Sequence, residues 1–88
     1  MKKYKLSEYV LKNEFGNDVY LLNTNTNCSI QLVGSCKEII NIVAKNSYTV
    51  EEIVKLLLNK FDVDYDTCIK DTKQIINDLC ELGFLNML

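Results

Sequence analysis

The chain has 88 residues, enough to bury a core without disulfides or metal ions. Nearly half of the residues are apolar, a quarter are charged, and the formal net charge is −2. Histidine, arginine and proline are absent, so the chain lacks the commonest general base near neutral pH and the bidentate side chain that recognises phosphate or guanine. The composition predicts one domain over residues 1–88, argues against an enzyme and gives no sign of a cofactor.

No apolar run approaches the roughly 18 residues that a membrane span needs, and the basic start of the chain is not followed by a hydrophobic signal core. We therefore expect a cytoplasmic protein that does not bind a membrane. The four cysteines contain no closely spaced pair, which favours reduced, apolar core residues over a metal site. Cys36 is the partial exception, because it falls at a predicted helix start, where a thiolate would be favoured.

Three short strands are predicted first, over residues 9–15, 19–22 and 28–32. Gly16, Asn17 and Asp18 form a strong turn signal between the first two. The polar run at residues 23–27 separates the second strand from the third, in which apolar and polar residues alternate. A meander of this kind leaves the third strand at an edge, and an open edge is a hazard that calls for an explanation.

Two capping boxes then predict helix starts. Ser35 with Glu38 is expected to open the first helix, which should end at Asn46 in a left-handed conformation. Thr49 with Glu52 is expected to open the second.

A third helix is predicted from Asp64 to Gly83, after which residues 84–85 should pack back on the core. Its expected core face is formed by Cys68, Thr72, Ile75, Leu79 and Leu82. Apolar residues extend that face on one flank to an arc of roughly 160°, wide for a helix with a single partner surface. Either another element covers this extra flank, or it forms one wall of an apolar groove beside the open strand.

The order of elements predicts an α+β domain, winged helix-turn-helix-like, with a three-stranded antiparallel sheet followed by three helices. Several segments, in this order, resemble the PqqD-like proteins, also called recognition elements for ribosomally made precursor peptides. These are Ile30-Gln31-Leu32 before a helix with Ile39-Ile40, TVEEIVKLL at residues 49–57, FDVD at residues 61–64, Asp71, and LCELGFL at residues 79–85.

The resemblance implies a protein without catalytic chemistry that binds the leader segment of a precursor peptide as an added strand. It implies a partner enzyme, such as a radical-SAM maturase or a lasso-peptide protease and cyclase, and the chain itself would be a monomer or a weak homodimer. The implied peptide-binding residues are Ser29, Ile30, Gln31 and Leu32 on the strand and Ile69, Lys73, Ile76 and Cys80 on the third helix. On this reading, Ile76→Asp would abolish binding and leave the domain folded.

A winged-helix regulator of DNA is the main alternative, because it has the same order of elements. Its recognition helix would be the third, where residues 64–82 carry five acids and two lysines, −5 + 2 = −3. Phosphate contacts supply most non-specific affinity for DNA, so this charge argues against a nucleic-acid partner. A third hypothesis is a homodimer in which the open strand pairs with its own copy.

Overall fold

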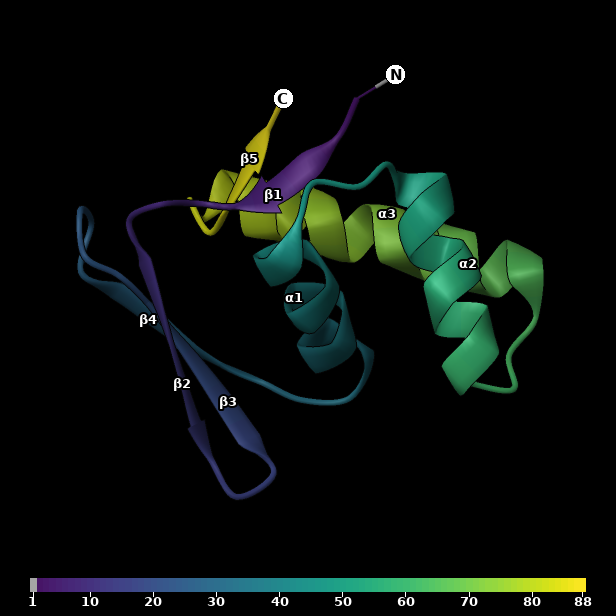
Figure 1. Cartoon of the computed structure of the whole chain (residues 1–88), viewed down its shortest axis with the longest axis horizontal. Helices are drawn as coiled ribbons and strands as arrows, with labels where there is room; N and C mark the ends of the chain where they lie inside the picture. The colour runs from purple at the N-terminus through teal and green to yellow at the C-terminus, as the bar shows by residue number, and fades with distance from the viewer. Residues whose placement is uncertain (1) are drawn as a thin grey trace.

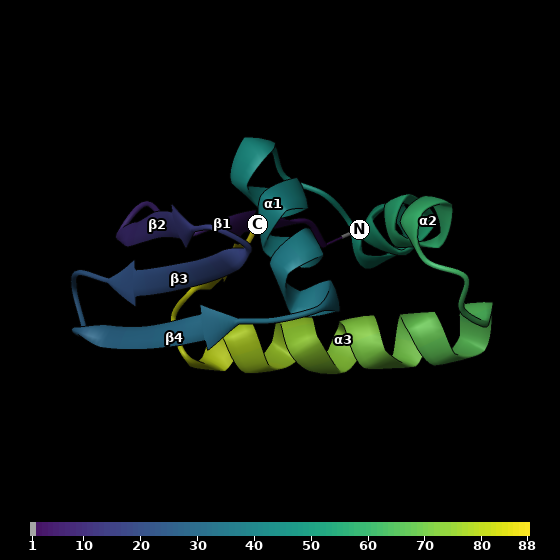
Figure 2. The ribbon, with the colours of Figure 1, turned by 90° about the horizontal axis from the view of Figure 1, so that it is seen from below.

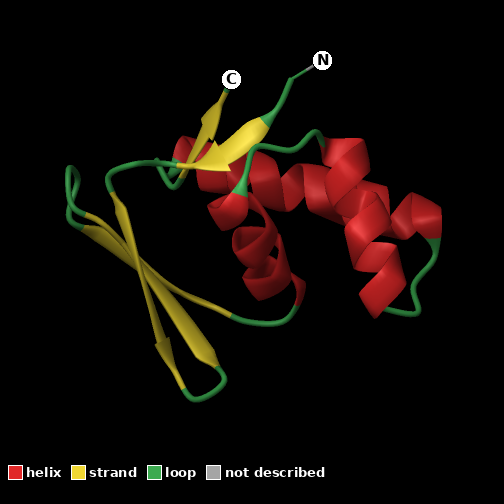
Figure 3. Ribbon diagram, viewed as in Figure 1, coloured by secondary structure: helices red, strands yellow, loops and turns green. Residues whose placement is uncertain are grey.

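The computed structural model describes residues 2–88, in which strands near the two ends of the chain pair with each other beside a meander and three helices (Figure 1). The elements are β1 (Tyr4–Leu6), β2 (Val10–Phe15), β3 (Asp18–Asn23), β4 (Cys28–Leu32), α1 (Ser35–Lys45), α2 (Val50–Lys60), α3 (Tyr65–Glu81) and β5 (Leu85–Met87). Strands β2, β3 and β4 form an antiparallel sheet in that order, and β1 and β5 form a separate ribbon (Figure 3). The predicted fold class is confirmed.

The turn between β2 and β3 has the predicted position. Phe15 pairs with Asp18 across the two residues Gly16 and Asn17, and Gly16 has a φ of 62°. A positive φ at the first central residue only is the mark of a type II′ turn, whose twist matches that of a hairpin. Glycine adopts this conformation without a steric penalty.

Within residues 2–88, none of the helices has the length and apolar character needed to cross a membrane.

Helix α1 begins where predicted, but not by the predicted mechanism. Gly34 occupies the N-cap position with a φ of 60°, and no side chain caps the helix. Because the chain turns sharply out of β4 at this glycine, Ser35 is already inside the helix. Glu38 instead pairs with Lys60 of α2 at 3.0 Å. The left-handed stop at Asn46 is also wrong, since Asn46 is extended with a φ of −164°.

The capping box of α2 is confirmed. The Thr49 hydroxyl accepts a hydrogen bond from the Glu52 amide at 3.2 Å, and the Glu52 carboxylate accepts one from the Thr49 amide at 2.9 Å. The bond from the Thr49 main chain holds the pKa of Glu52 below its ordinary value. Helix α3 begins where predicted, next to Asp64, and Asp64 also caps it, because its carboxylate accepts a hydrogen bond from the Thr67 amide at 3.2 Å.

The ribbon of β1 and β5 was not anticipated from the sequence. Helix α3 stops before Gly83, which has a φ of 85°, and Phe84 and Leu85 then pack back on the core as predicted. The chain then forms β5, which pairs with β1. On its other edge, β1 is bonded to Tyr48, because Tyr4 and Tyr48 exchange two main-chain hydrogen bonds of 2.8 and 3.1 Å. The ribbon packs against α1 through β1 and against α3 through β5.

The buried face of α3 is rotated from the predicted one. Cys68, Thr72 and Leu79 are buried as expected, but the fourth buried residue is Ile76, with 2% of its surface exposed. Leu82 was expected in the core, and 47% of its surface is exposed. Ile76 therefore belongs to the core and cannot be replaced by a charged residue without loss of stability.

Replacing Thr49 by alanine should lower the free energy of unfolding by about 1 kcal/mol, because one partner of the reciprocal capping box is lost. Ser35→Ala is the matched control, since the Ser35 side chain caps nothing, and it should change stability by less than about 0.5 kcal/mol. Urea denaturation followed by circular dichroism measures both. Equal losses in the two variants would contradict this account of the helix starts.

Replacing Ile76 by alanine should lower the free energy of unfolding by about 2–5 kcal/mol, the usual cost of emptying a packed site. The same measurement on Ile69→Ala, a half-buried position about two turns earlier, should show a clearly smaller loss. The prediction fails if the Ile76 variant is as stable as the Ile69 variant. Ile76→Asp should be still less stable, so it cannot serve as a probe of peptide binding.

Candidate functional site

The outer edge of β4 is open. Strand β4 has one neighbour among residues 2–88, β3, and lies at the end of the sheet. The two-residue turn makes Phe15 and Asp18 a hydrogen-bonded pair. Alternation along β3 then directs the main-chain groups of Leu21 towards its β4 partner, Ile30. The N–H and C=O groups of Ser29 and Gln31 consequently point away from the sheet, where an added strand would meet them.

The side chains of β4 follow the predicted alternation. Leu32 is buried, Cys28 and Ile30 are half-buried on the same face, and Ser29 and Gln31 are exposed on the other. Ile30 packs against the core without being covered by it. The strand residues named from the sequence therefore offer an added strand the outward main-chain groups of Ser29 and Gln31. They also offer one partly exposed apolar side chain, that of Ile30.

One flank of α3 lies beside the end of β4. It carries Asp71, Ile75, Asp78 and Leu82, spaced four, three and four residues apart on one face, and is called the acidic flank below. Ser35, which follows β4 closely, shares a pocket of about 190 Å³ with Asp71 and Ile75. Figure 2 shows β4 pointing towards the C-terminal end of α3, and the chain after β4 runs on past the helix to α1. The acidic flank is thus the part of α3 that an added strand would contact.

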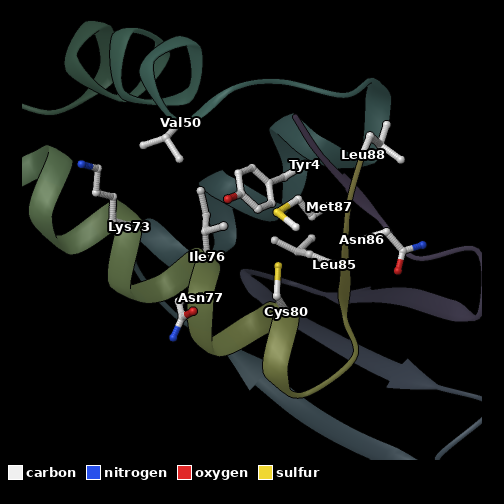
Figure 4. Close-up of a pocket in the computed structure, with 10 residues that line it drawn as sticks. All are labelled: Tyr4, Val50, Lys73, Ile76, Asn77, Cys80, Leu85, Asn86, Met87 and Leu88. Carbon is white, nitrogen blue, oxygen red and sulfur yellow. The ribbon is translucent and has the colours of Figure 1, made fainter. Parts of the chain in front are cut away.

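The helix residues named from the sequence lie on the opposite flank. Lys73, Ile76 and Cys80 line a groove of about 940 Å³ together with Tyr4 of β1 and residues of β5 (Figure 4). Ile69 is on the same side by its helical spacing and is half-buried. The structure therefore does not bring these four side chains to β4. The apolar arc is wide because its second half packs partly against the ribbon of β1 and β5.

Sequence reasoning missed the acidic flank as a possible wall. Ile75 and Leu82 were assigned to the core, although Ile75 is half-buried and Leu82 is exposed. Asp71 and Asp78, seven residues apart, alternate with them on the same face. The sequence did contain this pattern of acids and apolar residues on one helical face. It indicates a binding surface only once the position of β4 is known.

A buried amide holds the hairpin of β3 and β4 against the end of α3. Nδ2 of Asn23 donates a hydrogen bond to the carbonyl of Gly83 at 2.7 Å, and Asn23 is 3% exposed. Its Oδ1 accepts from the amides of Asn25 at 2.9 Å and Thr26 at 3.1 Å. A Cβ at Gly83 would lie 3.1 Å from Nδ2 of Asn23, so a glycine is suited both to the positive φ and to this close approach.

The surroundings of Cys36 and Cys80 oppose the thiolate form of these two side chains. Burial raises the pKa of the Cys36 thiol, a main-chain hydrogen bond opposes this, and the Asp78 carboxylate raises it further. The predicted preference of Cys36 for the thiolate form is therefore wrong. Burial also raises the pKa of Cys80. All four cysteines are free, and the described part of the chain contains no cluster of three potential metal ligands.

Comparison with known proteins agrees with the resemblance seen in the sequence. Among solved structures, the chain is similar to TbiB1 in complex with the TbiA(beta) leader peptide, with a TM-score of 0.86, 23% identity, and coverage of 93% of this chain and 94% of that one. It is also similar to a lasso peptide synthetase B1 complexed with the leader peptide, with a TM-score of 0.81, 14% identity, and coverage of 94% and 96%.

At these identities the two structures establish the fold alone. The comparison with curated proteins found no match. The family model for coenzyme PQQ synthesis protein D (PqqD), however, matches residues 18–85, which is most of the chain. The open strand, the helix beside it and this match lead to one conclusion: the chain belongs to the PqqD family.

Proposed function

We propose that the chain binds the leader segment of a ribosomally made precursor peptide as a fourth strand on β4. The single observation that carries the proposal is the open edge of β4 facing a helix flank with exposed apolar residues. Membership of the PqqD family supports it. Both similar solved structures are complexes with a leader peptide, which supports it further.

The groove has the parts that strand addition requires. The outward main-chain groups of Ser29 and Gln31 provide hydrogen bonds, which do not depend on the sequence of the guest. Ile30, Ile75 and Leu82 provide apolar contacts for every second side chain of the guest. Buried apolar anchors carry most of the energy in such interfaces, so these three side chains should decide which leaders bind tightly.

The acidic flank adds a preference of charge. Asp71 and Asp78 lie on the acidic flank by their helical spacing. Lys73, which sequence reasoning paired with an acidic leader residue, lines the groove on the other flank of α3. We therefore expect the leader to place lysine or arginine opposite the two aspartates. Each exposed pair of this kind contributes up to about 1 kcal/mol, which tunes affinity without dominating it.

The bound leader would be presented to a modifying enzyme, such as a radical-SAM maturase or a lasso-peptide protease and cyclase. Holding the leader raises the effective concentration of the attached core peptide at the enzyme's active site, so weak contacts to the core suffice. This role needs no catalytic group on the chain. DNA binding is disfavoured because α3 and its caps carry the net charge of −5 + 2 = −3 found in the sequence.

Gln31→Pro should weaken leader binding at least tenfold, because it removes an outward N–H while leaving the hydrogen bonds to β3 intact. Glu14→Pro is the matched control. It alters the outer edge of β2, on the far side of the sheet, and should leave affinity unchanged. Fluorescence anisotropy with a labelled leader peptide measures both, and circular dichroism checks the folds. Equal affinities in the two variants would refute strand addition on β4.

Neutralising the acidic flank should lower affinity for the leader about two- to tenfold at low salt and flatten the dependence of affinity on salt. The variant is Asp71→Asn with Asp78→Asn. Its control, Asp66→Asn with Glu81→Gln, makes the same change of net charge on other faces of α3 and should have little effect. If the control weakens binding as much, the attraction depends on overall charge and the assignment of the flank is wrong.

A further inference from the structure

The ribbon has an open edge of its own, that of β5. Leu88 donates a main-chain hydrogen bond to Lys3 at 2.7 Å, and Ser7 donates one to Phe84 at 3.0 Å. These bonds place residues 84 and 88 on the side facing β1, so alternation directs the main chain of Leu85 and Met87 to the other side. The outer edge of β1 is already paired with Tyr48. Within residues 2–88, β5 is therefore the edge at which this ribbon can grow.

A groove runs beside this edge and is lined largely by apolar side chains. It lies between β5 and the flank of α3 opposite the acidic one, and Ile76, Cys80, Tyr4 and Met87 line it (Figure 4). We call it the β5 groove. Its volume of about 940 Å³ is at the upper end of the range for ligand pockets, so it holds several side chains. Met87 is 55% exposed at its rim.

The charge at one end of the β5 groove is basic. Lys73 lines it, and a contiguous hollow of about 220 Å³ adds Lys2, with Glu51 as the acid nearby. Neither lysine takes part in a salt bridge in the described part of the chain. Beside the two edge strands, α3 thus separates charge between its flanks, with Asp71 and Asp78 towards β4 and Lys73 towards β5. Asp66, two turns before Lys73, is the acid on the second flank. A segment that suits one groove is disfavoured in the other.

We propose that the β5 groove binds an extended, acidic segment of a partner protein as a third strand of the ribbon. Apolar residues of that segment would enter the groove, and its acids would lie against Lys2 and Lys73. A second copy of this chain fits less well, because β5 itself, the segment that it would insert, carries no acid. The inference rests on the proposed function in one respect: the partner that it implies is the enzyme that modifies the leader's core peptide.

The two grooves lie on opposite flanks of one helix, so they can be occupied together. This arrangement would tie the leader to the enzyme through the rigid body of α3. Their opposite charges also prevent exchange, since a basic leader is repelled by the lysines of the β5 groove. The domain would in this way bridge two extended segments without confusing them.

Two short peptides test the inference on the full-length chain labelled with ¹⁵N. One alternates valine with glutamate and the other alternates valine with lysine, both blocked at their ends. The acidic peptide should shift the amide signals of Lys73, Met87 and Leu88 and leave those of Ser29 and Gln31 in place. No shift at β5 with the acidic peptide, or an equal shift with the basic one, would overturn the proposal. Concentration-dependent shifts at β5 without any peptide would overturn it in favour of a homodimer.

Two variants sharpen the test. Met87→Pro removes an outward N–H of β5 and should lower the affinity for the acidic peptide at least tenfold. Gln31→Pro on β4 should leave the affinity for that peptide unchanged. Lys73→Glu should reverse the preference of the groove from the acidic to the basic peptide. If these variants do not change peptide binding as expected while the leader still binds at β4, the proposal for the β5 groove alone is refuted. If the leader does not bind at β4 but the acidic peptide binds at β5 as expected, the proposed leader site is refuted instead.

Discussion

The hydrogen bond between Asn23 and Gly83 is the contact on which the site depends. It joins the end of β3 to the end of α3 across 60 residues of sequence. The same amide shapes the loop before β4 through the main chain of Asn25 and Thr26. A buried amide that loses its partner costs about 1–3 kcal/mol, so the hairpin cannot easily slide along α3. The distance between the open strand and the acidic flank is held in this way.

Helix α3 borders two surfaces because it is buried on one narrow face only. Cys68, Thr72, Ile76 and Leu79 meet the core, and the residues on either side of that face remain partly exposed. The sheet leaves one flank accessible next to β4, and the ribbon leaves the other accessible next to β5. Each flank thus combines apolar side chains with the unpaired main chain of an edge strand, the combination that extended peptides bind. Charge distinguishes the two.

Open edges usually invite aggregation, and the chain limits this by their length. Strand β4 has five residues and β5 has three, and short edge strands are a common protection against unwanted pairing. Gln31 and Ser29 add polar side chains on the exposed face of β4. An edge that is open, short and partly polar favours a matched guest over a chance contact.

Local chemistry was readable from the sequence alone. The alternation at residues 28–32, the Thr49 capping box and the start of the third helix at Asp64 each depend on neighbours in the chain, so they were predicted correctly. The Ser35 box failed because Gly34, one residue earlier, makes the turn out of β4. Even this error left the helix boundary in place.

What only the tertiary structure decided is which half of the apolar arc of α3 faces the core and which strand lies beside each flank. The sequence determined that the arc was too wide for one partner. It could not place Ile76 inside and Leu82 outside, because that choice depends on the ribbon formed by β1 and β5. Those strands have three residues each and lie at opposite ends of the chain. So short a strand is stabilised by its distant partner and leaves no periodic pattern of its own.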